Sequence, residues 1–293
     1  MRAAAILGLG SSERDLRPFQ ENSDASWLIG LPASSEQVDA ILLFGGDGTV
    51  HRHLAQLVQL QRPVLVVPCG SGNDFARALG LRRVKESLAA WRKFAAGAGN
   101  VRAIDLGVIT AGTGTAPHQH YFCCVGGVGL DGEISRRANN LPRWLRGHGG
   151  YVITLPPALA RFAAFPMKVM TPDPDRPNSL LVRNSGPTIV TTFANTPVYG
   201  GGMKIAPNAQ LDDGLLDICI VKDINKFKLF CLFPTIYFGR HLSIRNVDYF
   251  QSSRMKIETE YPFDAYADGE YVCQTPIEVC VDRAAMQVIV PAE

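Results

Sequence analysis

Hydrophobic residues in the first third of this chain fall into short unbroken runs. Residues 40–44 (AILLF) and 64–67 (VLVV) are apolar throughout, which is typical of parallel strands buried on both faces. Between them, residues 50–61 carry apolar side chains at the spacing of a helix that packs one face on a sheet. The order strand, helix, strand predicts an open α/β sheet.

The pattern changes after an amphipathic helix expected at 84–95. Turn-forming residues follow at 97–100 (GAGN), and we place a domain boundary there. Beyond it, strand-like runs separated by turns are expected at 102–109, 121–125, 167–170, 179–182, 188–194, 216–221, 254–258, 278–281 and 287–290. Helical stretches are expected at about 130–164 and 223–240. The chain is therefore predicted to be α/β, with a Rossmann-like nucleotide-binding domain over 1–100 and a mostly β, sandwich-like domain over 101–293.

Composition narrows the class of protein. The 293 residues are 46% hydrophobic, enough to bury a core, and the net charge of +2 does not favour nucleic acid as a partner. We find no run of the roughly 20 apolar residues that a membrane-spanning helix needs, and the early charges disfavour a signal peptide. The seven cysteines show no CxxC and no His/Cys metal spacing, which predicts reduced thiols in a cytoplasmic protein.

Glycine-rich loops follow both buried runs. The first is Gly45-Gly46-Asp47-Gly48-Thr49, and the second is Gly70-Ser71-Gly72-Asn73-Asp74. Open α/β sheets bind ligands at the carboxyl ends of their strands, and glycines followed by a helix N-terminus with unpaired N–H groups suit a phosphate. Thr49 is placed to cap the first helix or to bond a phosphate oxygen, and Asp47 adds a carboxylate where a nucleotide's Mg²⁺ would sit. The two loops predict a site for a nucleotide polyphosphate.

These loops resemble the nucleotide-binding pair of the diacylglycerol kinase catalytic-domain family, which includes bacterial lipid kinases and sphingosine kinases. Further matches in the same order are Asn195 with the glycines at 200–202, the run 212–217 (DDGLLD), and Asp268-Gly269-Glu270. The resemblance covers roughly residue 40 onward. Nearer the N-terminus, residues 8–12 (GLGSS) stand where the family has an Asn-Pro-x-Ser-Gly-like loop.

The resemblance implies ATP-dependent phosphorylation of a lipid hydroxyl, on a diacylglycerol or sphingoid-type lipid, in a cleft between the domains. ATP would bind the two glycine loops. Asp268 would act as the general base that accepts the hydroxyl proton, with Glu270 orienting it or binding metal. A structural Mg²⁺ would be held by the carboxylate of Asp213 and the carbonyls of Gln210 and Leu215.

Two other functions are weighed against this one. An NAD kinase shares GGDGT but is disfavoured by the GSGNDFAR sequence of the second loop. A non-catalytic lipid- or nucleotide-binding regulator is disfavoured by the acidic pair Asp268 and Glu270, since a binding module needs no base. We expect a lipid substrate, peripheral contact with a membrane surface and no nucleic acid, and a homodimer is compatible with the sequence.

Two further patterns can be explained by structure alone as well as by function. Residues 127–132 (GVGLDG) match the dinucleotide motif G-x-G-x-x-G, but no compact βαβ unit follows, so we expect a tight strand-to-helix turn and assign Asp131 to structure. The apolar stretch 151–165 is either a core helix with a solvated basic edge or an interfacial surface for anionic lipid. The basic residues around it are Arg143, Arg146, His148 and Arg161.

Overall fold

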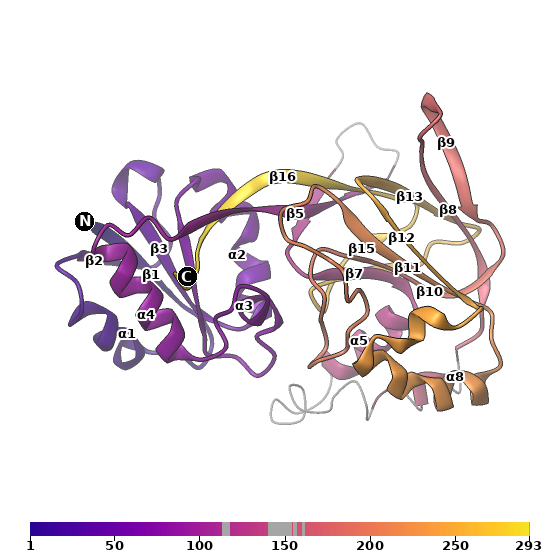
Figure 1. Cartoon of the computed structure of the whole chain (residues 1–293), viewed down its shortest axis with the longest axis horizontal. Coiled ribbons are helices and arrows are strands. Elements are labelled where there is room, and N and C mark those ends of the chain that lie inside the picture. Colours follow the sequence, from indigo (N-terminus) through magenta and orange to yellow (C-terminus); the bar gives the residue numbers. More distant parts are fainter. Residues whose placement is uncertain (113–117, 140–153, 155–156, 160–161, 293) are drawn as a thin grey trace. The chain divides into compact units, whose positions relative to one another are not determined.

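The computed structural model describes residues 1–112, 118–139, 154, 157–159 and 162–292 (Figure 1). They form two compact units, Met1–Asp105 together with Arg283–Glu293, and Leu106–Asp282. The sequence-based division assigned everything after residue 100 to the second domain. The end of the chain instead returns to the first unit, because β16 (Ile277–Ile289) pairs in parallel with β4 at Val288 and Val64.

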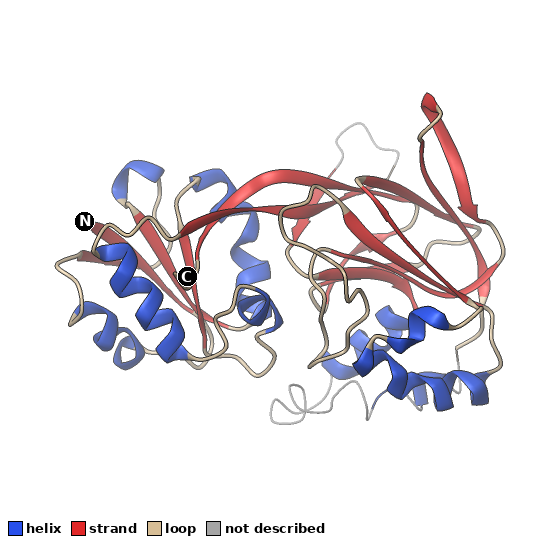
Figure 2. Cartoon of the chain, in the orientation of Figure 1, coloured by secondary structure: helices blue, strands red, loops and turns tan. Residues whose placement is uncertain are grey.

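The first unit is a parallel sheet in the order β2-β1-β3-β4-β16, flanked by helices (Figure 2). Helices α1 and α4 contact each other, as do α2 and α3. Every residue of β3 and β4 is buried, which is why both runs are continuously apolar. The predicted Rossmann-like domain is confirmed. Its elements are β1 (Arg2–Leu7), α1 (Glu13–Gln20), β2 (Ser26–Ile29), η1 (Ser35–Gln37), β3 (Ala40–Gly45), α2 (Asp47–Leu60), β4 (Val64–Pro68), α3 (Asp74–Ala78) and α4 (Val84–Ala95).

The second unit consists mainly of antiparallel strands in two layers. One layer runs β15-β14-β7-β10-β11-β12, the other runs β6-β5-β16-β13-β8-β9, and β8 joins them by pairing briefly with β10. The strands are β5 (Val101–Ala111), β6 (His118–Phe122), β7 (Val125–Gly129), β8 (Phe165–Asp173), β9 (Arg176–Asn184), β10 (Pro187–Ala194), β11 (Leu216–Lys222), β12 (Val247–Ser252), β13 (Arg254–Thr259), β14 (Asp264–Ala267) and β15 (Glu270–Gln274). One core cluster takes buried side chains from both layers, including Phe193 of the first and Val169 of the second. The predicted sandwich-like domain is confirmed.

Helices pack on the other side of the β7-β10-β11 layer. They are α5 (Leu130–Asn139), α8 (Lys226–Leu232) and the 3₁₀ segments η2 (Phe233–Phe238) and η3 (Arg240–Ser243). A second apolar cluster joins α5, β10 and the segment after β11 through Ile134, Ile189 and Ile224. The basic residues Arg143, Arg146, His148 and Arg161 lie outside the described residues. Within the described part of the chain, we find no helix of the length and apolar character needed to cross a membrane.

Candidate active site

The two glycine loops lie against each other in the first unit. Gly45 and Pro68, the last residues of β3 and β4, are register partners, so both loops leave the same edge of the sheet as predicted. A Cβ atom on Gly70 would lie 2.5 Å from the Cα of Gly46, so the loops meet backbone to backbone. Contact between the loops therefore requires glycine at this position.

Asp47 links the loops. Its two carboxylate oxygens accept hydrogen bonds from the backbone N–H groups of Asp74 and Phe75, each at 3.0 Å. These are the first N–H groups of α3, so the expectation that the second helix offers unpaired donors to phosphate is wrong for these two groups. A Cβ atom on Gly72 would lie 2.7 Å from Asp47 Oδ2, so this glycine makes room for the carboxylate.

The other polar residues of the loops also hold the loops together. Asn73 has a left-handed backbone (φ 58°), and its side chain accepts from Gly70 N–H at 3.0 Å and donates to Gly70 O at 2.7 Å. Asp74 is buried and pairs with Arg77 at 2.7 Å. Ser71 is exposed at the loop tip, where it is open to a ligand.

Thr49 sits in the first turn of α2. The N-cap of this helix is Gly46, so the prediction that Thr49 caps the helix is wrong. The threonine side chain packs instead on glycines, because a Cβ atom on Gly8 or Gly45 would come within 2.6 Å of its Oγ1. Gly48 is half-buried in the same turn. The N-terminal segment at Gly8 thereby borders the predicted phosphate site.

Asp268 lies in the second unit, at the turn between β14 and β15. It has a left-handed backbone (φ 51°), and its carboxylate accepts from the backbone N–H groups of Cys123 at 2.9 Å and Cys124 at 2.8 Å. These two bonds fix the position of the carboxylate. Glu270 begins β15 and is exposed. The backbone N–H groups of Cys123 and Cys124 orient the carboxylate. The role of Glu270, in orienting Asp268 or binding metal, stays a prediction.

The proposed metal loop precedes β11. Asp213 is half-buried, and its Oδ1 accepts from the Leu215 N–H at 2.9 Å across Gly214, which has φ 75°. Gln210 is exposed and Leu215 is half-buried. A carboxylate and backbone carbonyls in one tight turn are an all-oxygen donor set, which fits a hard cation such as Mg²⁺. The ligand set itself stays a prediction.

Asp131 was predicted to be part of a structural turn, and its side chain also has specific contacts. The turn is confirmed, since β7 ends at Gly129 (φ 110°) and α5 begins at the next residue. The Asp131 side chain is buried, and its Oδ1 accepts from the Tyr199 hydroxyl at 2.7 Å. Burial raises the pKa of Asp131 to about 6, against a smaller opposing effect of the Tyr199 hydrogen bond.

Asp131 lines a cavity of about 100 Å³ in the second unit. Most of the wall is apolar and comes from α5, β10, α8 and η2, as with Ile134, Ile189 and Leu229. Two buried polar atoms on the wall, Thr192 Oγ1 and His241 Nδ1, have no hydrogen-bond partner among the described residues. The cavity thus combines an apolar wall with hydrogen-bonding groups, which suits an amphipathic ligand.

The tautomer of His241 follows from the contact of its Nε2 atom. Nε2 lies 3.1 Å from the carbonyl oxygen of Ile205, so it carries the proton and donates. Burial lowers the pKa of His241, which favours the neutral ring. Nδ1 is therefore an acceptor on the cavity wall. Neither this histidine nor Tyr199 belongs to a sequence motif, and only the fold brings them to Asp131.

Comparisons with known proteins match both parts of the chain. Residues 9–109 match the diacylglycerol kinase catalytic domain, and residues 125–290 match the YegS C-terminal NAD kinase beta sandwich-like domain. A diacylglycerol kinase of Mycobacterium tuberculosis is 33% identical over 92% of this chain and 82% of its own length. A diacylglycerol kinase of Bacillus subtilis is 27% identical over 89% of this chain and 80% of its own length.

Solved structures show the same fold. A diacylglycerol kinase from Bacillus anthracis superposes with a TM-score of 0.66 at 20% identity, covering 99% of this chain and 96% of that one. An NAD kinase from Archaeoglobus fulgidus in complex with ATP gives a TM-score of 0.52 at 13% identity, over 99% and 94% of the two chains. The sequence matches, unlike these fold matches, separate the two enzyme classes that share GGDGT. The chain is a kinase and belongs to the diacylglycerol kinase catalytic-domain family, a family of lipid kinases.

Proposed function

We propose that this kinase transfers the γ-phosphoryl group of ATP to a hydroxyl group of a lipid. The observation that carries the proposal is the cavity beside Asp131, which joins an apolar wall to buried acceptors at Asp131 and His241. An apolar chain would lie along the wall, and a polar group of the lipid other than the hydroxyl that reacts at Asp268 would hydrogen-bond to the polar atoms there. NAD carries no such chain, which disfavours the alternative enzyme.

The glycine loops and Asp268 have different roles in the proposed reaction. ATP binds at Gly45–Thr49 and Gly70–Asp74, where Asp47 fixes one loop on the other. Asp268, held by two backbone N–H groups, accepts the proton of the lipid hydroxyl as its oxygen attacks phosphorus. Mg²⁺ at Gln210, Asp213 and Leu215 would stabilise the loop before β11 by mass action on the folded state.

The cavity has to widen for a complete acyl chain. Its volume is below the roughly 300–1,000 Å³ of most ligand pockets. One wall is formed by α8 and η2, whose Leu229, Leu232 and Phe233 pack on the second apolar cluster but are only partly buried, so their movement costs less than that of a fully buried element. The apolar chain therefore enters by displacing this segment.

The same segment presents apolar and basic side chains outward. Phe227 is 77% exposed, Phe238 is 73% exposed, and Lys226 and Lys228 are exposed beside them. Aromatic rings enter the acyl boundary of a bilayer, and lysines are attracted to anionic headgroups. We propose that this face contacts the membrane from which the lipid is drawn.

The membrane contact is tested by flotation with vesicles. Phe227→Ser is expected to reduce binding to vesicles that contain phosphatidylglycerol, while Leu180→Ser, which alters an exposed leucine on β9, leaves binding unchanged. Equal binding of both variants would show that α8 does not meet the bilayer.

The lipid acceptor is tested by incubating the protein with γ-labelled ATP and detergent-dispersed diacylglycerol, sphingosine, ceramide and glycolipid. We expect label in at least one lipid product. Leu229→Trp, which fills the cavity from α8, should raise KM for that lipid and leave KM for ATP unchanged. Cys231→Trp, at an exposed position of the same helix, is the matched control. Equal effects of both substitutions on KM for the lipid would show that the lipid does not bind in the cavity.

A further inference from the structure

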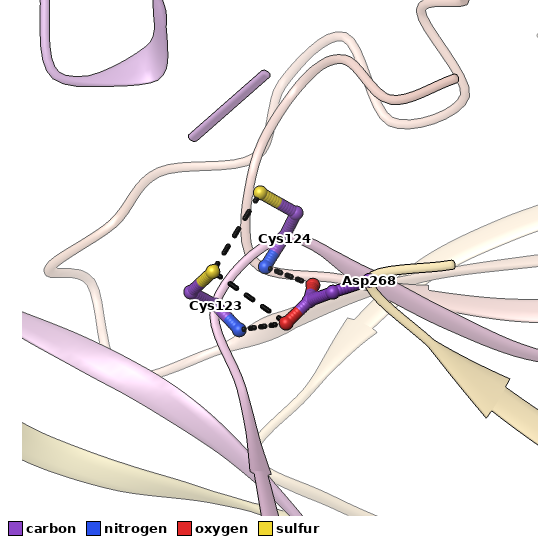
Figure 3. A group of neighbouring side chains, drawn as sticks. All are labelled: Cys123, Cys124 and Asp268. Atoms are coloured by element: carbon purple, nitrogen blue, oxygen red, sulfur yellow. Dashed lines mark hydrogen bonds between the residues drawn. The ribbon is translucent and has the colours of Figure 1, made fainter. Parts of the chain in front are cut away.

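Two adjacent cysteines lie against the proposed base. Cys123 and Cys124 form the turn between β6 and β7, and both are buried. Their sulfur atoms are 3.9 Å apart, and Cys123 Sγ lies 3.5 Å from Asp268 Oδ2 (Figure 3). The two sulfurs and a carboxylate oxygen all lie within 4.8 Å of one another.

Two of these three separations correspond to edges of a metal tetrahedron. Zinc binds thiolate at about 2.3 Å and carboxylate oxygen at about 2.0–2.2 Å, which gives edges of about 3.8 Å between two sulfurs and about 3.5–3.7 Å between sulfur and oxygen. The observed values are 3.9 and 3.5 Å. A disulfide would need the sulfurs at about 2.0 Å, so the turn is closer to the geometry of a shared cation.

The surrounding backbone holds this arrangement in place. The N–H groups of Cys123 and Cys124 donate to the Asp268 carboxylate, as described above. Asn195 is fully buried and grips the same turn, its side-chain Nδ2 donating to Cys123 O at 3.3 Å and its backbone N–H to Cys124 O at 2.8 Å. Ligands ordered by their neighbours in this way bind a metal with little reorganisation.

The donor set selects the kind of cation. Two thiolates favour a soft or borderline ion such as Zn²⁺ and disfavour Mg²⁺, which takes oxygen ligands. Three protein ligands leave one tetrahedral position for water. Each thiol releases its proton to solvent as the metal binds.

We propose that Cys123, Cys124 and Asp268 form a binding site for Zn²⁺ or a similar thiophilic cation, and that this cation inhibits the kinase. The cation would inhibit because it binds the Asp268 carboxylate, which then cannot accept the proton of the lipid hydroxyl. This inhibition rests on the proposed function. Metal binding itself does not depend on that function.

Binding is tested with Co²⁺, which reports thiolate ligation by a charge-transfer absorption in the near ultraviolet. The reduced full-length protein is titrated with Co²⁺ and then with Zn²⁺. We expect one equivalent of Co²⁺ to produce the band, and Zn²⁺ to abolish it. The band should be lost in Cys123→Ser/Cys124→Ser and kept in Cys231→Ser, which alters an exposed cysteine.

Circular dichroism shows whether the double variant folds; if it does not, Cys124→Ser alone serves, and a weakened band is expected. The proposal is overturned by absence of the band in the wild type, by an equal band in a folded double variant, or by a thiol titration of unreduced protein showing that the pair forms a disulfide instead.

Inhibition is measured separately, as the loss of lipid phosphorylation on adding Zn²⁺ at fixed Mg²⁺ and ATP, relative to each variant's own metal-free rate. The wild type should be inhibited and recover on chelation, and the double variant should resist. Cobalt binding without inhibition by Zn²⁺ would refute the proposal that the cation blocks Asp268, and the metal-binding site would still stand. If the wild type phosphorylates no lipid, the proposed function fails, and the cobalt titration still decides the metal site.

Discussion

The buried carboxylate of Asp131 makes a quantitative prediction about stability. Burial raises its pKa from 3.8 to about 6. Between these two pH values the folded protein keeps the proton on Asp131, whereas the unfolded chain has already released it. Stability contributed by this group is therefore present below about pH 4 and is lost as pH rises to about 6. At 1.36 kcal/mol for each pKa unit, the loss is roughly 3 kcal/mol.

Asp131→Asn removes this cost, because the amide is neutral at every pH and its oxygen still accepts from the Tyr199 hydroxyl. The variant should melt at a higher temperature than the wild type at pH 8, and this advantage should shrink toward pH 4. Roughly 3 kcal/mol corresponds to a change of about 6–12 °C in the difference between the two proteins.

The assay is differential scanning calorimetry of both proteins between pH 4 and pH 8, with the difference in Tm plotted against pH. Tyr199→Phe is the companion variant. It removes the hydrogen bond that opposes the rise in pKa, so the loss of stability should continue to a higher pH and reach a larger total than in the wild type. A pH-independent difference for Asp131→Asn would refute the reasoning, since it would mean that the carboxylate is solvated.

Other predictions follow from the described contacts. Asp268→Asn should lower turnover by about 10²–10⁴-fold with ATP affinity nearly unchanged. Both carboxylate oxygens accept N–H groups, and an amide has only one oxygen to do so. A melting curve must therefore show that the variant is still folded. Gly72→Val should weaken ATP binding in calorimetry, since its Cβ would displace the Asp47 carboxylate, and unchanged binding would remove this loop from the nucleotide site. Asp213→Ala should abolish a Mg²⁺-dependent rise in Tm, and the metal assignment fails if the wild type shows no such rise.

The first unit could be largely predicted because its signals are local. Continuous apolar runs gave β3 and β4, and helical spacing gave α2 and α4. Helix α1 was missed because it contains a proline and buries only Leu16 and Phe19, which leaves no repeated apolar spacing to detect. The runs at 278–281 and 287–290 were expected as two strands and form the single strand β16. No breaking glycine or proline separates these two runs.

The candidate site could be predicted only where a motif is contiguous. The glycine loops and Asp268 were predicted from contiguous motifs, but the contacts that hold them join residues far apart, such as Asp268 with Cys123. Tyr199 and His241 reach the cavity from separate segments. Asp131 was assigned to a turn. Its burial depends on helices from other parts of the chain that cover the sheet, and the residues next to Asp131 in the sequence do not predict them.

The most direct test of the account is a single labelling reaction that offers lipid and NAD together. The protein is incubated with γ-labelled ATP, NAD and mixed vesicles that contain diacylglycerol and sphingosine, and the products are separated by organic extraction. The account predicts that label enters the organic phase with the wild type and is reduced with Asp268→Asn. Label confined to the aqueous phase as phosphorylated NAD, or equal lipid labelling by both proteins, would contradict it.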